Sequence, residues 1–430
     1  MTTALLTDRY ELTMLGSALR DGTAERHCVF EVFARRLPDG RRYGVVAGTA
    51  RLLDAIADFT FDAQTVEWLR DTGVVDAPTA EYLSDYRFNG DVEGYPEGEL
   101  FFPQSPILTV TGTFAEAVVL ETLALSVLNH DSAVAAAAAR MVTAAAGRPI
   151  IEMGSRRTHE QAAIASSRAA YLAGFASTTN LAAGERYGVP TAGTAAHSFT
   201  LLHDGFTLLH DGERAAFQAQ VAALGPSTTL LVDTYDITRG IELAVEVAGP
   251  DLGAVRIDSG DLGVMAHQAR AQLDRLGATG TRIVLSGDLD EYSIAALAAT
   301  PVDAYGAGTS VVTGSGAPTA GLVYKLVEVD GRPVAKRSEH KASNGGRKTA
   351  VRAHKPTGTA VEEIVYSGTV PELGPGERPL QRPLIRGGAP VDNLPTLDDS
   401  RAHLRAATIS LPWDGLKLSR GEPTIPTRFA

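Results

Sequence analysis

Between residues 149 and 310 the sequence repeats one pattern, a short apolar run that ends in a polar turn and in most cases precedes a stretch of helical periodicity. Strands that alternate with helices at roughly 20 to 35 residue spacing are typical of parallel βαβ units. Seven such runs occur, and we therefore expect an α/β barrel, possibly irregular, in preference to an open dinucleotide-binding sheet. The runs cover residues 149–157, 174–180, 189–198, 230–236, 254–261, 283–288 and 302–310.

We expect three parts in the chain. Residues 1 to about 120 mix short apolar runs with turn signals, which predicts an N-terminal α+β domain. Residues 121–319, which include an alanine-rich helix near their start, form the barrel. The sequence pattern is again typical of strands over about 320–370. We expect residues 371–430 to form a proline- and glycine-rich extension that packs on the rest of the protein.

The net charge of −12 argues against a diffuse nucleic-acid footprint or a patch for anionic membranes. An anionic ligand must therefore be held by a local group of basic residues. The single cysteine, Cys28, excludes an internal disulfide framework and a multi-cysteine metal site. Apolar runs fall short of the roughly 18 residues of a membrane span, and the first residues lack a signal pattern, so we expect a cytoplasmic protein.

Aspartates follow three consecutive apolar runs, where the carboxyl ends of parallel strands would gather them on one face. Carboxylates gathered in this way can hold Mg²⁺ that bridges the phosphates of a substrate. Each aspartate alone could instead cap the next helix, but its repetition over three turns favours the functional interpretation. The pairs are Asp233 and Asp236, Asp258 and Asp261, and Asp288 and Asp290.

Glycine-bearing turns follow the same runs. Ser259-Gly260, Ser286-Gly287 and residues 306–310 would expose backbone N–H groups at the starts of helices, an arrangement that binds phosphate. Glycine in such a turn can also serve the turn geometry alone. The sequence contains neither the G-x-G-x-x-G fingerprint of dinucleotide-binding folds at a helix start nor a Walker A motif.

Basic side chains also stand at the predicted strand ends. Arg156 and Arg157 follow the first run, and Arg256 lies inside another, where a charge is costly unless it is paired. An ion pair with a neighbouring aspartate or a fork that binds a carboxylate or phosphate would satisfy Arg256, and we favour the fork. His197 lies near the end of its own run. A histidine there could serve as a general base, as a hydrogen-bond donor to phosphate or as a hydrogen-bonded core residue.

These residues predict a protein that binds a phosphorylated, Mg²⁺-chelated substrate, and they leave the reaction open. Five motifs, in matching order and spacing, give the chain a resemblance to the nicotinate phosphoribosyltransferase family. The similarity begins near Thr7-Asp8-Arg9-Tyr10 and extends over most of the chain. The motifs are Gly154-Ser155-Arg156-Arg157, Gly193-Thr194-Ala195-Ala196-His197-Ser198, Asp233-Thr234-Tyr235-Asp236, Arg256-Ile257-Asp258-Ser259-Gly260-Asp261 and Gly306-Ala307-Gly308-Thr309.

The resemblance implies an irregular α/β barrel of about seven strands, with an α+β domain built from N-terminal and C-terminal segments. It implies an ATP-dependent, ligase-type enzyme of NAD salvage that joins nicotinate to 5-phosphoribosyl 1-diphosphate (PRPP) and releases nicotinate mononucleotide and diphosphate. ATP hydrolysis assists through a phosphohistidine, which the resemblance assigns to His197. Mg²⁺ is implied as the cofactor, ATP as a co-substrate and a homodimer as the assembly.

The resemblance also assigns roles to further residues. Arg156, Thr194 and Arg256 are implied as contacts to nicotinate or its phosphoribosyl partner, since a carboxylate substrate suits an arginine fork. Tyr10 is implied as the aromatic side chain that stacks on the pyridine ring from the second subunit, so a dimer would share its active sites. The implied phosphoribosyl and diphosphate contacts are Asp233, Asp258, Gly287, Asp288, Gly308 and Thr309, and Asp233 and Asp258 would also meet Mg²⁺ through the substrate.

Three alternatives stay open. The sister activity on nicotinamide would place an acidic side chain at the pyridine substituent, and Glu152 lies close enough in sequence to supply it. Quinolinate phosphoribosyltransferase needs no phosphohistidine, and its substrate calls for more basic residues. A binding protein without activity would be expected to have lost His197 or the aspartates. The sequence departs from the family pattern over 341–348, the segment expected to form a flap over the site.

Overall fold

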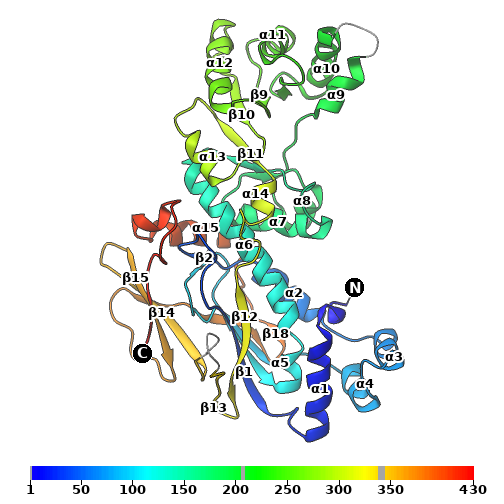
Figure 1. Ribbon diagram of the computed structural model, residues 1–430, viewed down its shortest axis with the longest axis vertical. Coiled ribbons are helices and arrows are strands. Elements are labelled where there is room, and N and C mark those ends of the chain that lie inside the picture. The colour runs from blue at the N-terminus through cyan, green and yellow to red at the C-terminus, as the bar shows by residue number, and fades with distance from the viewer. Residues whose placement is uncertain (1, 205–208, 338–343) are drawn as a thin grey trace. The chain divides into compact units, whose positions relative to one another are not determined.

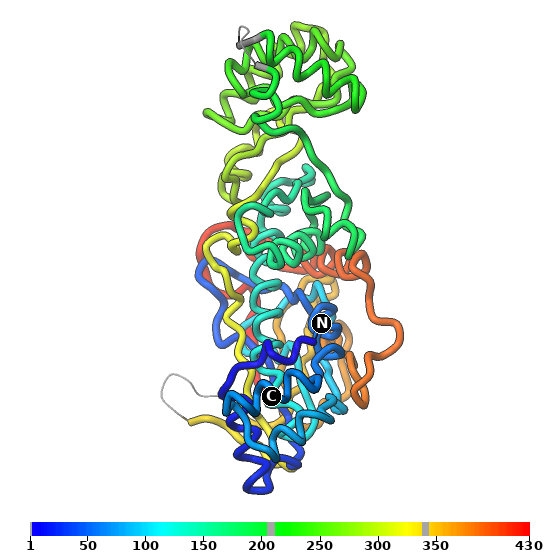
Figure 2. The backbone as a smooth tube through the Cα atoms, turned by 90° about the vertical axis from the view of Figure 1, so that its right-hand side faces the viewer, coloured from blue at the N-terminus to red at the C-terminus, as the bar shows by residue number. Residues whose placement is uncertain are grey.

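The computed structural model describes residues 2–204, 209–337 and 344–430, and the chain divides into two compact units (Figure 1). Unit 1 comprises Met1–Ala136 and Ala317–Ala430, so both ends of the chain belong to it (Figure 2). Unit 2 comprises Ala137–Gly316. The boundary between the units falls within the long helix α6 (Glu121–Ala145).

Unit 1 is built on an antiparallel sheet of seven strands in the order β13-β12-β1-β5-β3-β17-β18. Strand β1 (His27–Ala34) is flanked by β12 (Leu322–Val329) and β5 (Leu108–Thr113), so segments from the two ends of the chain share one sheet. The ring of Phe30 on β1 stacks on Tyr324 on β12 at a centroid distance of 4.9 Å. The other strands of this sheet are β3 (Asp91–Gly94), β13 (Arg332–Pro333), β17 (Arg382–Arg386) and β18 (Ala389–Pro390).

Two smaller sheets and a set of helices complete unit 1. The order of the four-stranded sheet is β16-β14-β15-β19, and β2 pairs with β4. These strands are β2 (Gly44–Val45), β4 (Leu100–Phe101), β14 (Lys348–His354), β15 (Ala360–Ser367), β16 (Glu377–Pro379) and β19 (Thr427–Phe429). The helices are η1 (Ala4–Leu6), α1 (Arg9–Asp21), α2 (Thr49–Ala57), α3 (Ala63–Asp71), α4 (Ala77–Ser84), α5 (Phe114–Val118), α15 (Leu397–Ile409) and η2 (Trp413–Leu416).

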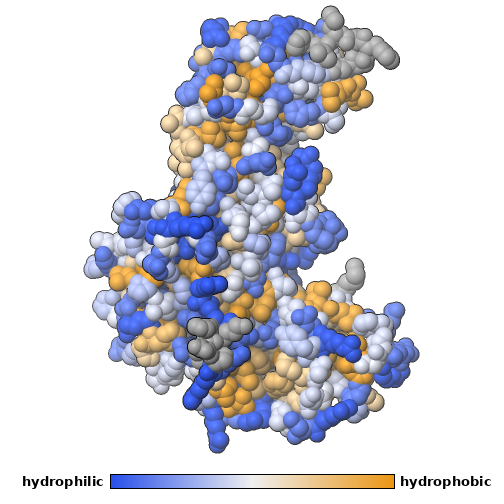
Figure 3. Space-filling view, in the orientation of Figure 1, coloured by the Kyte–Doolittle hydropathy of each residue, from blue (hydrophilic) through white to orange (hydrophobic). Residues whose placement is uncertain are grey.

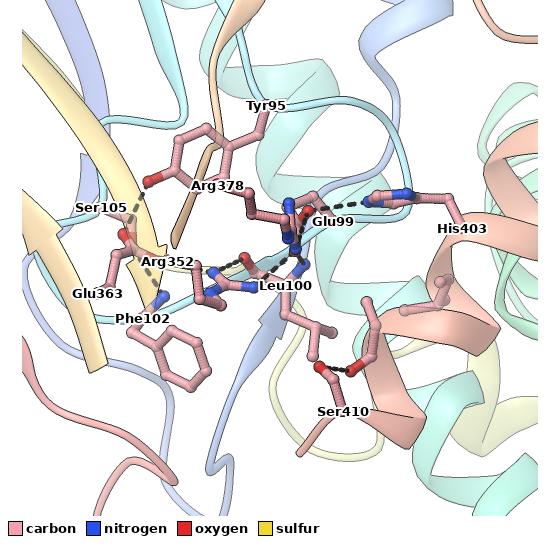
Figure 4. Close-up of polar contacts among 12 residues, drawn as sticks. Tyr95, Glu99, Leu100, Phe102, Ser105, Arg352, Glu363, Arg378, His403 and Ser410 are labelled. Atoms are coloured by element: carbon pink, nitrogen blue, oxygen red, sulfur yellow. Dashed lines mark hydrogen bonds and ion pairs between the residues drawn. The ribbon is translucent and has the colours of Figure 1, made fainter. Parts of the chain in front are cut away.

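A buried charged cluster joins segments from the two ends of the chain within unit 1 (Figure 4). Arg352 donates from Nη1 to Glu99 and from Nη2 to Glu363, each over 2.6 Å. Glu99 Oε2 also lies 2.8 Å from Nη2 of Arg378 and 2.9 Å from Nε2 of His403. Burial raises the pKa of Glu99, but Arg352 and the other partners outweigh burial and hold that pKa well below its usual range.

Unit 2 is built on a parallel sheet of six strands in the order β7-β6-β11-β10-β9-β8. Its strands are β6 (Ile150–Glu152), β7 (Ser177–Thr178), β8 (Thr229–Leu231), β9 (Ala254–Ile257), β10 (Arg282–Leu285) and β11 (Ala304–Ala307). Its helices, beside the second part of α6, are α7 (Glu160–Ala173), α8 (Leu181–Tyr187), α9 (His197–Asp204), α10 (Leu209–Leu224), α11 (Ile237–Ala248), α12 (Leu262–Arg275), α13 (Glu291–Ala296) and α14 (Thr309–Val312).

Helices connect the parallel strands, as the alternating sequence pattern predicts. In β9 and β10 most residues are apolar, and these apolar residues are buried. Helix α11 packs so closely on the end of β8 that a Cβ on Gly240 would lie 2.3 Å from the carbonyl oxygen of Val232. A glycine at this position therefore permits the close approach of helix and strand.

The mixed α/β fold is confirmed, whereas a closed barrel of about seven strands is not seen in the residues that the structure describes. Six of the expected runs become strands, but residues 189–198 contribute only an isolated parallel bridge from Thr191 to Thr178. Pro190 lacks the N–H that a ladder requires, and this limits pairing of the segment. Thr178 and Ala192 donate the two backbone hydrogen bonds of the bridge, to Pro190 and Thr178.

On the face drawn in Figure 3, hydrophilic and hydrophobic residues are intermixed. Over the residues that it describes, the structure contains no helix with the length and hydrophobicity of a membrane span.

Candidate active site

The turns after β8, β9 and β10 present polar side chains at one edge of the unit 2 sheet. Asp233 and Thr234 follow β8, Asp258 follows β9, and Ser286 follows β10. These three strands are parallel neighbours, so their carboxyl ends meet at the same edge. The backbone N–H of Asp258 and the hydroxyl of Ser259 each donate to Oδ2 of Asp233 over 2.8 Å, which ties the first two turns together.

Arg256 is the centre of a hydrogen-bonded group that spans these turns. Its side chain is 14% exposed. Nε donates to Ser286 over 2.8 Å, Nη1 to Thr194 over 3.1 Å and Nη2 to Asp258 over 2.9 Å. The ion pair that was one of two alternatives for Arg256 is therefore present, and Thr194 joins it from residues 189–198.

Asp258 is held in the ionised state by the same group. Its Oδ1 accepts from the Ser286 hydroxyl over 2.5 Å as well as from Arg256. Burial raises the pKa of Asp258, but the Ser286 hydrogen bond and the Arg256 guanidinium outweigh burial, and the pKa lies below its usual value. The site therefore contains a fixed carboxylate beside a fixed guanidinium.

His197 lies at the first position of α9, with 42% of its side chain exposed. Its Nδ1 lies 3.1 Å from the hydroxyl oxygen of Thr234, and its Nε2 lies 4.0 Å from Oδ1 of Asp233. The Asp233 side chain is 1% exposed, and its Oδ1 has no hydrogen-bond partner among the described residues. The histidine thus faces a buried carboxylate and is itself accessible, which is not the environment of a core histidine.

In each pair of aspartates, one residue lies at the strand end and the other caps a helix. Asp236 accepts from the N–H of Arg239 at the start of α11, and Asp261 accepts from that of Val264 at the start of α12. Asp290 caps α13 in the same way, through the N–H of Ser293. The second aspartate of every pair is a cap, and the first, at 233, 258 and 288, stands at the strand end.

Glycines bring neighbouring turns into contact. Gly287 has a φ of +105°, and a Cβ there would lie 2.6 Å from the carbonyl oxygen of Asp258. Asp288 is exposed and accepts from the Thr309 hydroxyl over 3.4 Å, which links the turns after β10 and β11. A Cβ on Gly308 would lie 3.1 Å from the carbonyl oxygen of Met153, so the turn after β11 packs against the end of β6.

Arg156 and Glu152 lie in different environments. Arg156 is exposed, and its guanidinium has no hydrogen-bond or ion-pair partner among the described residues. Glu152 is buried, where its Oε2 accepts from Ser167 over 2.8 Å and from Thr178 over 2.6 Å, and its Oε1 accepts from the N–H of Gly154. The carboxylate that could have faced a nicotinamide is therefore satisfied inside the protein.

Two predicted features belong to unit 1. Tyr10 belongs to unit 1, on α1, and its side chain is 47% exposed. Burial, Glu121 and Glu11 raise the pKa of Tyr10 to about 12. Residues 341–343 of the expected flap lie outside the described residues, while Lys348 at its end donates to buried Glu31 over 2.7 Å.

A metal site made by the protein alone is not present in the described parts of the chain, where no three His, Cys, Asp or Glu residues cluster suitably. Asp233 and Asp258 are joined through a backbone N–H, and each has a different set of partners. A cation at this edge would therefore need oxygen ligands from a bound substrate as well.

Similarity to known proteins identifies the family. Residues 5–129 match the nicotinate phosphoribosyltransferase (NAPRTase) N-terminal domain. The chain is 64% identical over 426 residues to a nicotinate phosphoribosyltransferase of Mycobacterium tuberculosis, over 99% of this chain and 94% of the relative. The chain belongs to the nicotinate phosphoribosyltransferase family.

Solved structures agree with this membership. The fold is similar to the crystal structure of human nicotinic acid phosphoribosyltransferase, with a TM-score of 0.85, 28% identity and coverage of 98% of this chain and 97% of that one. Nicotinate-nucleotide pyrophosphorylase from Pyrococcus furiosus is similar with a TM-score of 0.77 and 25% identity, over 94% of each chain. The resemblance to the nicotinate phosphoribosyltransferase family that the motifs gave is thus confirmed.

Sequence reasoning assigned no side-chain role to three small hydroxyl residues of this member of the nicotinate phosphoribosyltransferase family. Thr234 contacts His197, Ser259 donates to Asp233, and Ser286 lies between Arg256 and Asp258. All three stand inside or beside the motifs, next to the charged residues that drew attention. Their position one residue after an aspartate or at the end of a strand is the signal that could have found them.

Proposed function

We propose that this chain is a cytoplasmic nicotinate phosphoribosyltransferase, which joins nicotinate to PRPP and releases nicotinate mononucleotide and diphosphate in NAD salvage. The observation that carries the proposal is the group formed by Arg256, Thr194, Ser286 and Asp258 beside His197 and Asp233, in a chain of this family. A guanidinium, a fixed carboxylate and an accessible histidine at one edge of a parallel sheet suit a substrate with a carboxylate and phosphates.

The arginine contacts favour nicotinate over nicotinamide. A guanidinium has five N–H donors, and Arg256 uses one on each nitrogen for Ser286, Thr194 and Asp258. One N–H on each terminal nitrogen is left for a ligand, which matches the two oxygens of a carboxylate. Arg156 supplies a second cation at the same edge of the sheet. Glu152 supports the same choice, because its carboxylate is occupied by Ser167, Thr178 and Gly154.

We assign the phosphoribosyl and diphosphate groups to Gly287, Asp288, Gly308 and Thr309, with Asp233 and Asp258 at the ribose hydroxyls and the metal-bound diphosphate. The unpartnered, buried Oδ1 of Asp233 and the partly exposed carboxylate of Asp258 fit a role beside Mg²⁺. Mg²⁺, when bound through the substrate, would neutralise charge on the diphosphate that leaves.

His197 would couple ATP hydrolysis to the transfer. A neutral imidazole nitrogen can take the γ-phosphoryl group of ATP, and the carboxylate of Asp233, 4.0 Å from Nε2, would stabilise the positive charge that the ring then carries. The exposed position of His197 allows a nucleotide to reach it.

The assembly and the closure of the sheet belong to the same proposal. We place Tyr10 on the pyridine ring of a second subunit, so that a homodimer would share its active sites, and the exposure of the Tyr10 ring supports this role. Residues 189–198 would supply a further strand of an irregular barrel of about seven strands. The bridge from Thr191 to Thr178 supports this role, because it pairs the segment with β7.

The test is nucleotide formation from PRPP and Mg²⁺, with nicotinate or nicotinamide, each with and without ATP. The proposal predicts product from nicotinate, formed faster when ATP is present. Product from nicotinamide instead would keep the fold and His197 but overturn the substrate assignment. Absence of product from both would favour a ligand-binding protein without this activity.

A further inference from the structure

The turn that carries Arg156 is closed by its own backbone. The N–H of Arg157 donates to the carbonyl of Gly154 over 2.8 Å, which makes a β-turn just after β6. Ser155 and Arg156 are the two central residues of that turn. Because the Arg156 side chain is exposed, the direction in which it extends depends on what holds the backbone of the turn.

The first residue of the turn is held from the interior of unit 2. Buried Glu152 accepts from the N–H of Gly154 through Oε1. Its Oε2 accepts from the hydroxyls of Ser167 over 2.8 Å and of Thr178 over 2.6 Å, so the carboxylate is held on both oxygens. These contacts place Gly154 but do not reach the two central residues of the turn.

Asn180 supplies a contact to the centre of the turn. Its Nδ2 donates to the Ser155 hydroxyl over 3.0 Å, in partly buried surroundings. Its backbone N–H donates to the Thr178 hydroxyl over 3.0 Å, and its Oδ1 accepts from the N–H of Ala183 as the N-cap of α8. Asn180 is therefore fixed by the end of β7 and by α8, and it joins the turn after β7 to the turn after β6.

The two ends of the Asn180 amide have separate roles. The oxygen caps α8, and serine would serve as a cap at this position about as well. The NH₂ group is the donor that contacts Ser155, and a serine hydroxyl is too short to replace it there. The cap alone therefore does not explain the contact between Asn180 and the turn that carries Arg156.

We propose that Asn180 is a positioning residue for Arg156, because its contact with Ser155 holds the turn so that the guanidinium meets the carboxylate of nicotinate. The inference rests on the proposed nicotinate phosphoribosyltransferase function. Among the described residues no carboxylate pairs with Arg156, so its guanidinium is available to a ligand. A guanidinium on a fixed turn loses less conformational freedom on binding, so loss of the contact would weaken nicotinate binding and leave the chemical step unchanged.

Two variants break the contact from its two sides. Asn180→Ser keeps a cap for α8 and removes the amide that reaches Ser155, whereas Ser155→Ala removes the acceptor and leaves the cap intact. Ser84→Ala is the matched control, because the Ser84 hydroxyl donates to the carbonyl of Ala80 within its own helix, α4. Steady-state kinetics of each variant give kcat and the KM values for nicotinate and for PRPP.

For Asn180→Ser and Ser155→Ala we expect the KM for nicotinate to rise about threefold to tenfold, the size of one lost hydrogen bond, while kcat and the KM for PRPP stay within about twofold. Ser84→Ala should match the wild type in all three. An unchanged KM for nicotinate in either variant of the contact, or a rise in the KM for PRPP alone, would overturn the positioning role.

A double-mutant cycle separates positioning from a purely structural role. If Asn180 acts through Arg156, adding Asn180→Ser to Arg156→Ala should change the KM for nicotinate by less than about twofold. The same rise in Arg156→Ala as in the wild-type background would show that Asn180 does not act through Arg156.

Hydrogen exchange of the Gly154 and Arg157 amides tests the turn without any need for activity. In Asn180→Ser and Ser155→Ala these amides should exchange about threefold to tenfold faster than in the wild type, because the turn opens more often. Exchange at the wild-type rate would contradict the proposal. If the wild type forms no nucleotide from nicotinate, the proposed function fails, and the exchange rates still decide whether Asn180 holds the turn.

Discussion

The guanidinium of Arg256 and the carboxylate of Asp258 lie 2.9 Å apart, two residues from each other, at the carboxyl end of β9. Ser286 bridges them from the next turn, because its hydroxyl accepts from Nε of Arg256 and donates to Oδ1 of Asp258. The pair is therefore assembled before a ligand arrives. A fork held in this way loses little conformational freedom when it binds a carboxylate.

Arg256→Lys should lower kcat/KM for nicotinate by about 30- to 100-fold. A lysine keeps the charge but cannot reach Ser286, Thr194 and Asp258 at once, and a buried charged hydrogen-bonding group that loses its partners costs about 2–3 kcal/mol. Steady-state rates with varied nicotinate check this. As a control, Arg275→Lys alters an arginine in the last turn of α12 and should stay within about twofold. An unchanged kcat/KM in Arg256→Lys would remove the fork from substrate binding.

Stability should depend on Asp258 at acid pH. The pKa of Asp258 is below its usual value in the folded protein, so its contribution to stability is present above the unfolded pKa of about 3.9 and is lost as the pH falls through the lower folded value. Asp258→Asn should therefore show a free energy of unfolding that falls less steeply below about pH 4 than in the wild type. Urea unfolding at several pH values measures this, and parallel curves for the two proteins would speak against the assignment.

Arg352→Leu should destabilise unit 1 by about 3–5 kcal/mol, because it leaves Glu99 and Glu363 as buried charges without their shared partner. Arg428→Leu is the matched control, since the Arg428 pair with Glu362 is largely exposed and should contribute less than about 1 kcal/mol. Chemical denaturation of both variants makes the comparison. Equal losses in the two variants would show that burial of the pair does not matter.

Glu152→Gln should lower stability by about 1–3 kcal/mol and leave the preference for nicotinate over nicotinamide unchanged. An amide can replace only part of the acceptor role that Glu152 has toward Ser167, Thr178 and the N–H of Gly154. Melting curves and rates with the two substrates separate the effects. A change in substrate preference with intact stability would mean that Glu152 faces the pyridine substituent.

The sequence pattern was sufficient to locate the strand ends of unit 2 but not to divide the aspartates. Spacing placed Asp233 and Asp236 in one turn, but Asp236 caps α11 whereas Asp233 accepts from the N–H of Asp258 in the next turn. Which carboxylate reaches the helix N-terminus depends on the backbone path through the turn, and residue types do not state that path. One motif includes Thr234, and Ser286 lies in a predicted glycine-bearing turn, yet nothing local distinguishes a hydroxyl that contacts a charged side chain from an ordinary turn residue.

Long-range pairing explains the other differences. The expectation of a closed barrel counted residues 189–198 as a full strand, but Pro190 limits it to one bridge in the described part of the chain. The contact of Glu99 with Arg352 joins positions 253 residues apart, and no periodicity predicts such a partner. The family resemblance was the signal that brought the two ends of the chain together before the sheet order showed it.

The central claim is that the chain makes nicotinate mononucleotide and that His197 couples ATP to this reaction. The most direct measurement follows product formation from nicotinate, PRPP and Mg²⁺ with γ-labelled ATP, in the wild type and in His197→Ala. The account predicts ATP-stimulated product and a labelled protein for the wild type, and slower product without label or ATP stimulation for His197→Ala. Full ATP stimulation in His197→Ala would contradict it.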